Sequence, residues 1–219
     1  MLTTNITVEK VKTEAGRQEA IGVLASTYVE EKGWIRDPLK AFEPEDLDNP
    51  AVAWFIAYVH DAPAGVLRVM YEPPLETYLD YGLEFEQSQT DLLQFIRENK
   101  IAEIGRFAVA PAFRKRLGVA LMLMRDATRE TVERGWTHYV TDVFEGEKHS
   151  PYWFHRRVLG FTEIASHDTG ELHCTYRRIT MLLSLGQGYR RLKKLNNRVF
   201  KILTEGWGPE LHKQIASGS

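Results

Sequence analysis

The stretch FAVAPAFRKRLGVALMLM, Phe107 to Met124, constrains the fold more than any other part of the chain. It begins with apolar residues typical of a buried strand and ends with an apolar run typical of a buried helix. Three consecutive cations, Arg114, Lys115 and Arg116, lie between the two. Where a strand leads directly into a helix, the first helical N–H groups lack intrahelical partners and attract anions. The stretch therefore predicts a phosphate or pyrophosphate site, with a solvated basic turn as the alternative.

The composition narrows the function classes. The chain has 219 residues and a formal net charge of -2, which argues against a general nucleic-acid binder. A single cysteine, Cys174, argues against an internal disulfide and a multi-cysteine metal site. The N-terminus lacks the features of a signal peptide, and the longest apolar run, residues 51–59, is too short to span a membrane. We therefore expect a cytoplasmic protein without a metal, with contact to a membrane surface at most.

The first half of the chain predicts a helix, a hairpin and loops. Apolar residues at helical spacing indicate an amphipathic helix over residues 16–33 that ends at Gly33. Two β-like runs, 51–59 and 64–72, are joined by His-Asp-Ala-Pro, which predicts a hairpin with a four-residue turn. Loops are expected over residues 35–50 and 72–88, and a short helix over residues 89–99.

The second half alternates between strand and helix. Strands are predicted over 101–110, 138–145, 161–168 and 171–183, and helices over 117–134 and 151–158. Antiparallel strands followed by a strand–helix–strand unit predict an α+β fold with a mixed, mostly antiparallel sheet flanked by helices. Residues 188–203 form one predicted basic helix with an apolar face of Tyr189, Leu192, Leu195, Val199 and Ile202. We expect a main domain over residues 1–182 and a C-terminal helical extension over residues 183–219.

Two motifs, taken in the order in which they occur along the chain, resemble those of the GNAT acyltransferase superfamily. Lys115-Arg-Leu-Gly118-Val-Ala120 follows a strand, and the late segment YWFHRRVLGF ends in Gly160-Phe161. The resemblance implies a GNAT-like fold whose loop holds the pantetheine and phosphates of an acyl donor. The residues that it implies for donor binding are Phe107, Val109, Arg114, Lys115, Arg116, Gly118, Val119 and Ala120.

Within this superfamily, residues 17–165 resemble long-chain N-acyl amino acid synthases and autoinducer (acyl-homoserine-lactone) synthases. The resemblance rests on Tyr28 to Trp34, on Glu103-Ile-Gly-Arg106-Phe107, and on Gly65 and Arg68 of an early strand. Gly105 replaces the usual serine, and the acidic stretch after Trp34 only loosely resembles the autoinducer motif. These departures favour the N-acyl amino acid synthase branch. Trp34, Arg68 and Asp142 are the candidate substrate-binding residues.

Acyl transfer from a thioester to an amine needs a base, hydrogen-bond donors and an acid. Glu103 is the candidate base, and the alternative is a buried ion pair of Glu103 with Arg106 or Arg68. Arg106 and His155 complete the candidate catalytic group. In many members of the superfamily, a tyrosine at the position of Arg156 protonates the leaving thiolate. His155, next to it, is therefore the proposed proton donor here, and the alternative is a surface residue. Asp142 contacts the incoming amine, caps a turn or pairs with a cation.

The sequence thus predicts an N-acyltransferase that moves a long acyl chain from acyl-carrier protein, or less favourably from coenzyme A, to the amine of an amino acid. Alternatives are an acetyl-CoA-dependent small-amine acetyltransferase, a lactone synthase, and a non-catalytic module that binds a carrier or lipid. The basic C-terminal helix is interpreted as a docking surface for the acidic carrier protein or for anionic lipid. The alternative is an amphipathic helix that packs over the sheet and exposes its lysines to solvent.

Overall fold

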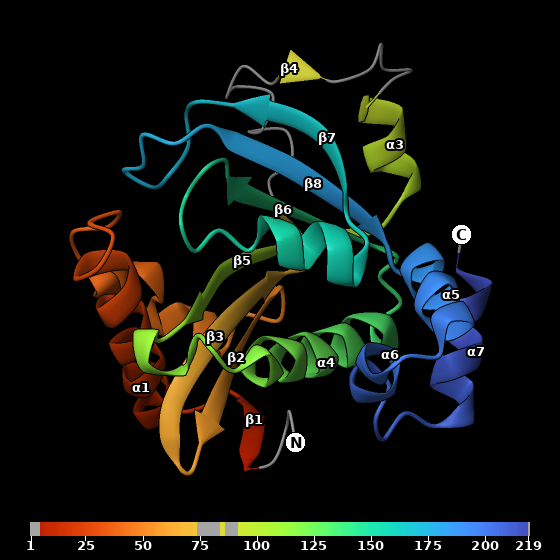
Figure 1. The fold of residues 1–219 in the computed structure, drawn as a ribbon, viewed down its shortest axis with the longest axis horizontal. Coiled ribbons are helices and arrows are strands. Elements are labelled where there is room, and N and C mark those ends of the chain that lie inside the picture. The colour runs from red at the N-terminus through yellow and green to blue at the C-terminus, as the bar shows by residue number, and fades with distance from the viewer. Residues whose placement is uncertain (1–4, 74–83, 86–91, 219) are drawn as a thin grey trace. The chain divides into compact units, whose positions relative to one another are not determined.

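A mixed, mostly antiparallel sheet with helices packed on it carries the fold (Figure 1). The computed structural model describes residues 5–73, 84–85 and 92–218. These residues divide into two units: the first takes the chain up to residue 70, 104–130 and 202–205, and the second takes the rest. Strand β5 (Ile101–Val109) contributes its first three residues to the second unit and the others to the first. The predicted α+β, GNAT-like class is confirmed, whereas the division at residue 182 stays a prediction.

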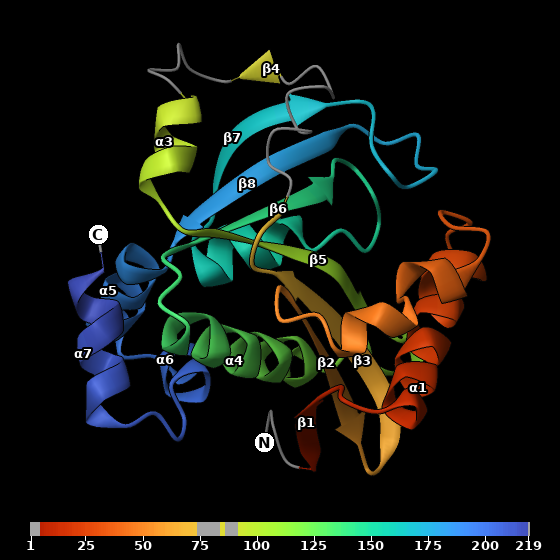
Figure 2. The same ribbon diagram turned by 180° about the vertical axis from the view of Figure 1, so that it is seen from behind.

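The first unit has the strand order β1-β2-β3-β5. Strands β1 (Ile6–Lys10), β2 (Val52–Val59) and β3 (Ala62–Met70) pair antiparallel and lie side by side (Figure 2). Strand β1 was missed by the sequence reasoning. The predicted four-residue hairpin turn is wrong, because Ala62 pairs with Val59 and leaves only His60 and Asp61 in the turn. Both have positive φ, 50° and 63°, which a two-residue turn between right-twisted strands requires.

The helices of the first unit begin with α1 (Glu14–Leu24), which Thr13 caps by accepting a hydrogen bond from the Gly16 N–H. A π-helical turn, η1 (Ala25–Val29), continues α1, and the chain then turns at Gly33, whose φ is 62°. The expected loop over residues 35–50 contains two 3₁₀ turns, η2 (Pro38–Ala41) and η3 (Pro44–Leu47). A third 3₁₀ turn, η4 (Pro111–Phe113), precedes α4 (Leu117–Glu133), of which Leu117 to Glu130 belongs to this unit.

Helix α4 packs closely against β3 at Gly65. A Cβ at this glycine would lie 2.9 Å from Val119 Cγ1, 3.1 Å from Leu123 Cδ1 and 3.0 Å from the carbonyl oxygen of Ala108. Any larger side chain would force strand and helix apart. Gly65 is therefore required for the position of the first turns of α4.

The second unit has the strand order β5-β6-β8-β7-β4. Strand β6 (His138–Phe144) pairs parallel with β5, while β8 (Arg178–Ser184) pairs antiparallel with both β6 and β7 (Thr162–His167). A short strand, β4 (Glu84–Phe85), pairs with β7. The predicted strand over 171–183 is wrong in its first seven residues, because these form the β7–β8 connection. Most of the expected loop over 72–88 lies outside the described residues.

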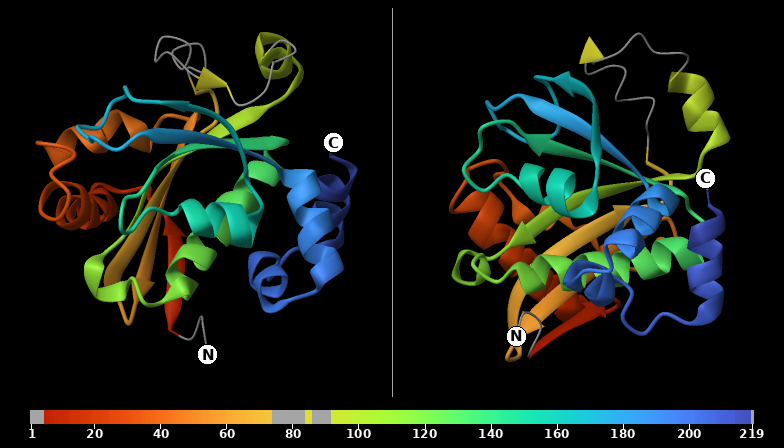
Figure 3. Two further views of the ribbon diagram at one scale, coloured as in Figure 1. Left: turned by 45° about the horizontal axis from the view of Figure 1, so that its top comes forward. Right: turned by 45° about the vertical axis from the view of Figure 1, so that its right-hand side comes forward.

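Among the described residues, the second unit contains the last three residues of α4 and, wholly or partly, the helices α3 (Leu92–Glu98), the π-helical η5 (Phe154–Leu159), α5 (Leu185–Leu195), α6 (Arg198–Leu203) and α7 (Pro209–Ser217). The prediction of one continuous basic helix is wrong, because Asn196 adopts a φ of 42° and ends α5. Leu195 is accordingly 57% exposed and does not join the buried face. Helices α5 and α7 lie side by side (Figure 3).

An aromatic cluster joins the C-terminal helices. The ring of Tyr189 contacts Phe200, Trp207 and His212, and its hydroxyl lies 2.9 Å from Nδ1 of His212.

Among the described residues, no helix is long and apolar enough to cross a membrane.

Candidate functional site

Strand β5 is irregular where the predicted catalytic motif lies. Its parallel ladder with β6 covers Ile101, Ala102 and Glu103 only. Two residues later, Arg106 has a φ of 49°, a left-handed conformation that costs a residue with a side chain roughly 1–3 kcal/mol. Such strain persists where the surrounding fold enforces it, and it clusters at functional sites. The regular strand geometry is therefore interrupted at Arg106, inside the predicted motif Glu103 to Phe107.

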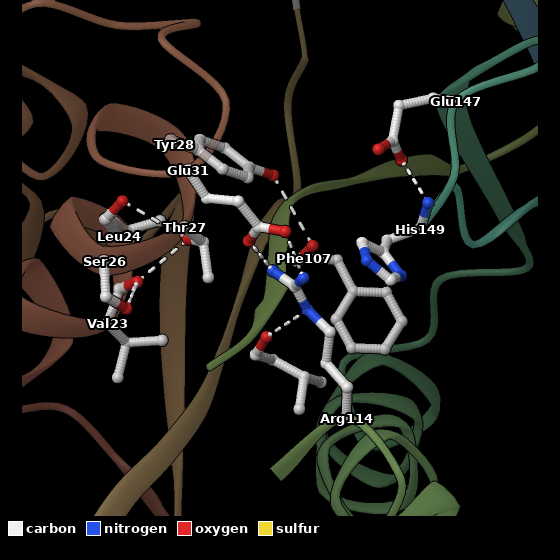
Figure 4. A network of polar contacts seen from close by, with 11 residues as sticks. Val23, Leu24, Ser26, Thr27, Tyr28, Glu31, Phe107, Arg114, Glu147 and His149 are labelled. Atoms are coloured by element: carbon white, nitrogen blue, oxygen red, sulfur yellow. Dashed lines mark hydrogen bonds and ion pairs between the residues drawn. The ribbon is translucent and has the colours of Figure 1, made fainter. Parts of the chain in front are cut away.

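The cation loop after β5 is already partly neutralised by the chain itself. Arg114 forms a two-pronged ion pair with Glu31, and its Nε donates to the carbonyl oxygen of Val109 at 3.1 Å (Figure 4). Glu31 follows the π-helical turn at the end of α1. Arg114 thus fixes the loop to the N-terminal helix, which differs from the expected role as a free phosphate ligand.

Lys115 and Arg116 are exposed, and among the described residues neither side chain has a hydrogen bond or ion pair. They immediately precede α4, whose first-turn N–H groups carry the positive end of the helix dipole. Gly118 and Val119 are buried and Ala120 is half-buried at the start of the helix. Lys115, Arg116 and the first turn of α4 are therefore the candidates for binding an anion here.

The end of α1 reaches β5 through Tyr28. Its hydroxyl lies 3.5 Å from the carbonyl oxygen of Phe107 (Figure 4). Its ring packs against that of Trp34, with the centroids 5.5 Å apart. The wide π turn also leaves backbone carbonyls that side chains satisfy: the hydroxyls of Ser26 and Thr27 donate to Val23 at 2.9 and 2.8 Å. Trp34 itself is only 7% exposed, so it supports Tyr28 from the core of the unit.

Arg68 lies on β3 opposite Trp54 of β2 and is half-buried. Trp54 stacks on Phe42 at 4.2 Å and donates from Nε1 to Asp46 at 2.9 Å. The acidic stretch that follows Trp34 is therefore anchored to the sheet beside Arg68.

In the second unit, Glu103 and Asp142 lie on the same face of the sheet. Glu103 is the register partner of Val140, and side chains alternate along a strand, so Asp142 shares the face of Val140 two residues further on. Asp142 accepts a hydrogen bond from the Thr180 hydroxyl at 2.8 Å and lies 3.0 Å from Nε2 of His167. After β6, the His149 N–H donates to Glu147 at 2.8 Å and closes the turn (Figure 4).

His155 does not fit the expected role of proton donor. Its exposure is 0%, and its ring lies against Phe161 at 4.8 Å and Phe154 at 5.7 Å. Burial lowers its pKa to about 3, so at neutral pH the ring has no imidazolium proton to release. We therefore assign His155 to the core and correct both sequence-based interpretations, the catalytic one and the surface one.

The structure brings Arg114, Phe107 and Val109 together with two residues that sequence reasoning did not select, Tyr28 and Glu31. The helical spacing of Tyr28 marked it as an apolar-face residue, and nothing in the sequence paired Glu31 with Arg114. His167 and Thr180 were also missed, because their link to Asp142 depends on the strand order. Among the described residues, no group of three potential metal ligands lies together.

Comparison with known proteins bears on this arrangement. A family model described as N-acyl amino acid synthase FeeM matches residues 21–177. The solved structure of FeeM, an N-acyl amino acid synthase from uncultured soil microbes, is similar with a TM-score of 0.66 and 17% identity, covering 87% of this chain and 96% of that one. A search of curated proteins finds no match.

Two acetyltransferases show the same fold. An N-acetyltransferase from Staphylococcus aureus Mu50 has a TM-score of 0.57 at 10% identity, covering 83% of this chain and 99% of its own. The ribosomal-protein-S18-alanine N-acetyltransferase from Escherichia coli has a TM-score of 0.53 at 13% identity, covering 82% of this chain and 93% of its own. At these identities the likeness shows the fold, and it agrees with the GNAT-like sheet described above.

Proposed function

The chain belongs to the N-acyl amino acid synthase FeeM family and is an N-acyltransferase, and we propose that it moves a long acyl chain from acyl-carrier protein to the α-amine of an amino acid. The observation that carries this proposal is the family match over residues 21–177, which includes β5, the cation loop and α4. The finer assignment of donor and acceptor rests on the charges and contacts that follow.

The cation loop supports a donor with few phosphates. Coenzyme A carries a pyrophosphate and a 3′-phosphate, whereas the pantetheine arm of a carrier protein carries one phosphodiester. With Arg114 held by Glu31, only Lys115, Arg116 and the first turn of α4 remain to bind phosphate. The charge of two side-chain cations and a helix N-terminus matches that of one phosphate better than that of three.

A basic surface on α5 and α6 supports the same donor. Its six cations, all exposed, are Arg190, Arg191, Lys193, Lys194, Arg198 and Lys201. Two of them are partly committed: Arg190 donates to the carbonyl oxygens of Ala216 and Gly218, and Arg191 to that of Val158. Lys193 places Nζ 5.6 Å from the ring centroid of Tyr189, and Leu195 at the end of α5 is 57% exposed. We propose that this α5–α6 surface docks the acidic carrier, with steering that weakens as salt rises.

The acceptor chemistry is assigned to the second unit. In the proposed step, the carboxylate of Glu103 takes a proton from the ammonium of the amino acid, directly or through water. The freed nitrogen lone pair attacks the thioester carbonyl, the new C–N bond forms, and the C–S bond breaks. The attacking nitrogen then carries one proton more than an amide holds, and this proton passes to the departing thiolate, since His155 is neutral and buried and supplies none. Asp142 binds the ammonium group.

The second candidate is acetyl transfer from acetyl-CoA to a small amine, which the acetyltransferase folds among the similar structures favour. Donor chain length separates the two functions. An acetyltransferase excludes long acyl chains, whereas the proposed enzyme prefers them. A lactone synthase would release a cyclised product of lower mass.

The test is a direct assay with paired donors. Purified protein is incubated with palmitoyl-acyl-carrier protein, palmitoyl-CoA or acetyl-CoA and a mixture of the standard amino acids, and products are identified by mass spectrometry. We expect N-palmitoyl amino acid from the carrier donor and little from either CoA thioester. Absence of any N-acyl product from all three donors would overturn the proposed function. Equal rates with both palmitoyl donors would overturn the carrier assignment alone.

Matched variants test the docking surface in the same assay. Lys194→Glu with Arg198→Glu should reduce kcat/KM about tenfold or more for palmitoyl-carrier protein at low salt. The same variant should use palmitoyl-pantetheine, which lacks the protein moiety, at the wild-type rate. An equal loss with both donors contradicts carrier docking on this surface.

A further inference from the structure

Three neighbouring strands of the second unit hold a hydrogen-bonded chain in which Asp142 is joined by two residues that the proposed reaction does not use, Thr180 and His167. Thr180 on β8 donates from Oγ1 to Asp142 Oδ1 at 2.8 Å. On the other side, His167 of β7 places Nε2 3.0 Å from Asp142 Oδ2 and Nδ1 2.7 Å from the carbonyl oxygen of Thr169. Both oxygens of the Asp142 carboxylate are therefore engaged by residues of other strands.

The partners of His167 fix the orientation of its ring. Nδ1 lies 2.7 Å from the carbonyl oxygen of Thr169, which can only accept a hydrogen bond, so Nδ1 donates. Nε2 lies 3.0 Å from Asp142 Oδ2, whose partner oxygen accepts from Thr180. A flip of the ring would break both of its contacts.

The carbonyl that holds the far side of His167 is itself fixed. Arg178, the register partner of His167, donates from Nη1 to the carbonyl oxygen of Asp168 at 2.6 Å and from Nη2 to that of Leu172 at 2.7 Å. These two contacts bracket Thr169 in the β7–β8 connection. Gly170, with a φ of 154°, lies so close that a Cβ would stand 2.7 Å from Arg178 Nε. The connection is thus built to hold Thr169 in place.

The pair is asymmetric in its exposure. The His167 side chain is 0% exposed, whereas that of Asp142 is 21% exposed. A buried ion pair is a poor source of stability, because desolvation offsets the attraction, and apolar residues of similar volume often serve as well. A fully enclosed ring behind a carboxylate with an open side is instead suited to orient that carboxylate.

The open side of Asp142 faces the same way as Glu103. From the spacing of adjacent strands and the rise along a strand, their Cα atoms lie roughly 8 Å apart. A primary ammonium group between two carboxylates at this separation can donate one hydrogen bond to each. The candidate base and Asp142 therefore form an acidic pair suited to an amine.

We propose that His167 and Thr180 are positioning residues, which orient the Asp142 carboxylate so that it binds the ammonium group of the acceptor amino acid beside Glu103. The inference rests on the proposed function and adds two residues to it. The class of acceptor follows: a primary amine that arrives protonated, since an uncharged acceptor gains nothing from a fixed carboxylate.

The test measures steady-state kinetics with palmitoyl-acyl-carrier protein and the amino acid that gives the strongest product signal in the wild-type assay. Asp142→Asn and His167→Leu should each raise KM for the amino acid about tenfold to a hundredfold, the range expected for a lost hydrogen bond to a charged group. Thr180→Val, which keeps the shape but removes the hydroxyl, should raise it severalfold. KM for the donor should stay unchanged in all three.

Two further measurements separate positioning from general support of the fold. His167→Gln keeps a donor near Asp142 and should restore part of the lost affinity for the amino acid. His138→Gln is the matched control, because His138 is a buried histidine on the same strand and face as Asp142, and its KM should match the wild type.

The double variant Asp142→Asn/His167→Leu should behave like Asp142→Asn alone, since His167 acts through Asp142. Independent, multiplying effects would overturn the proposal, as would a wild-type KM in both Asp142→Asn and Thr180→Val. If His167→Leu does not fold, the outcome is decided by those two conservative variants. A wild-type enzyme without any N-acyl product sinks the proposed function itself, which is a different result from active enzyme with unchanged KM in the variants.

Discussion

The assignment of His155 as a buried, neutral core residue can be tested by measuring how stability depends on pH. The side chain has 0% exposure, and burial lowers its pKa from 6.5 to about 3. Below pH 6.5 the unfolded chain protonates this histidine, whereas the folded chain does not until about pH 3. The unfolded state therefore binds more protons, and the free energy of unfolding falls as the pH falls.

The size of the effect follows from the shift. The slope approaches about 1.4 kcal/mol per pH unit, so His155 alone should cost the wild type about 2.5 kcal/mol between pH 6 and pH 4. His155→Leu cannot take up this proton and should lose that much less stability over the same interval. All carboxylates titrate in both proteins, so the difference between the two isolates the contribution of residue 155.

The assay is urea denaturation followed by tryptophan fluorescence at pH 6, 5 and 4, with turnover measured at pH 7.5. His173→Leu is the control, because His173 is exposed and burial does not act on its ring. Equal losses of stability in wild type and His155→Leu would refute the buried, neutral assignment. Loss of turnover in a His155→Leu protein that is folded at pH 7.5 would restore His155 as a catalytic candidate.

Other predictions concern packing and charge in the first unit. Gly65→Ala should lower the free energy of unfolding by about 1–3 kcal/mol in urea titrations, because its Cβ meets three atoms at 2.9 to 3.1 Å. Gly22→Ala in α1, where a Cβ meets nothing within 4 Å, should instead raise the free energy of unfolding by about 0.5–1 kcal/mol. If both variants change the free energy of unfolding in the same direction, the packing argument is contradicted. Glu31→Gln should release Arg114 and raise kcat/KM for palmitoyl-CoA severalfold relative to the carrier donor, with little change in Tm, since a partly exposed pair contributes about 0–1 kcal/mol.

Local patterns identified most of the elements. The strand–loop–helix at residues 107–124 and the hairpin of β2 and β3 depend on apolar periodicity, which a sequence displays directly. The errors fall where one or two residues change the backbone: His60 and Asp61 shorten the hairpin turn, and Asn196 ends α5. Left-handed conformations at residues other than glycine leave a weak signal in a sequence, and they decide such boundaries.

By itself, the sequence determined the fold class and the family, because motif spacing and periodicity are local properties of the chain; the anion site at the cation loop stays a prediction. Only the tertiary structure decided which charges remain available. Glu31 pairs with Arg114, which lies 83 positions further along the chain. Burial keeps the His155 ring uncharged, and the strand order brings His167 and Thr180 to Asp142. Charge pairing and desolvation depend on distance in space, which residues far apart in the chain acquire only on folding.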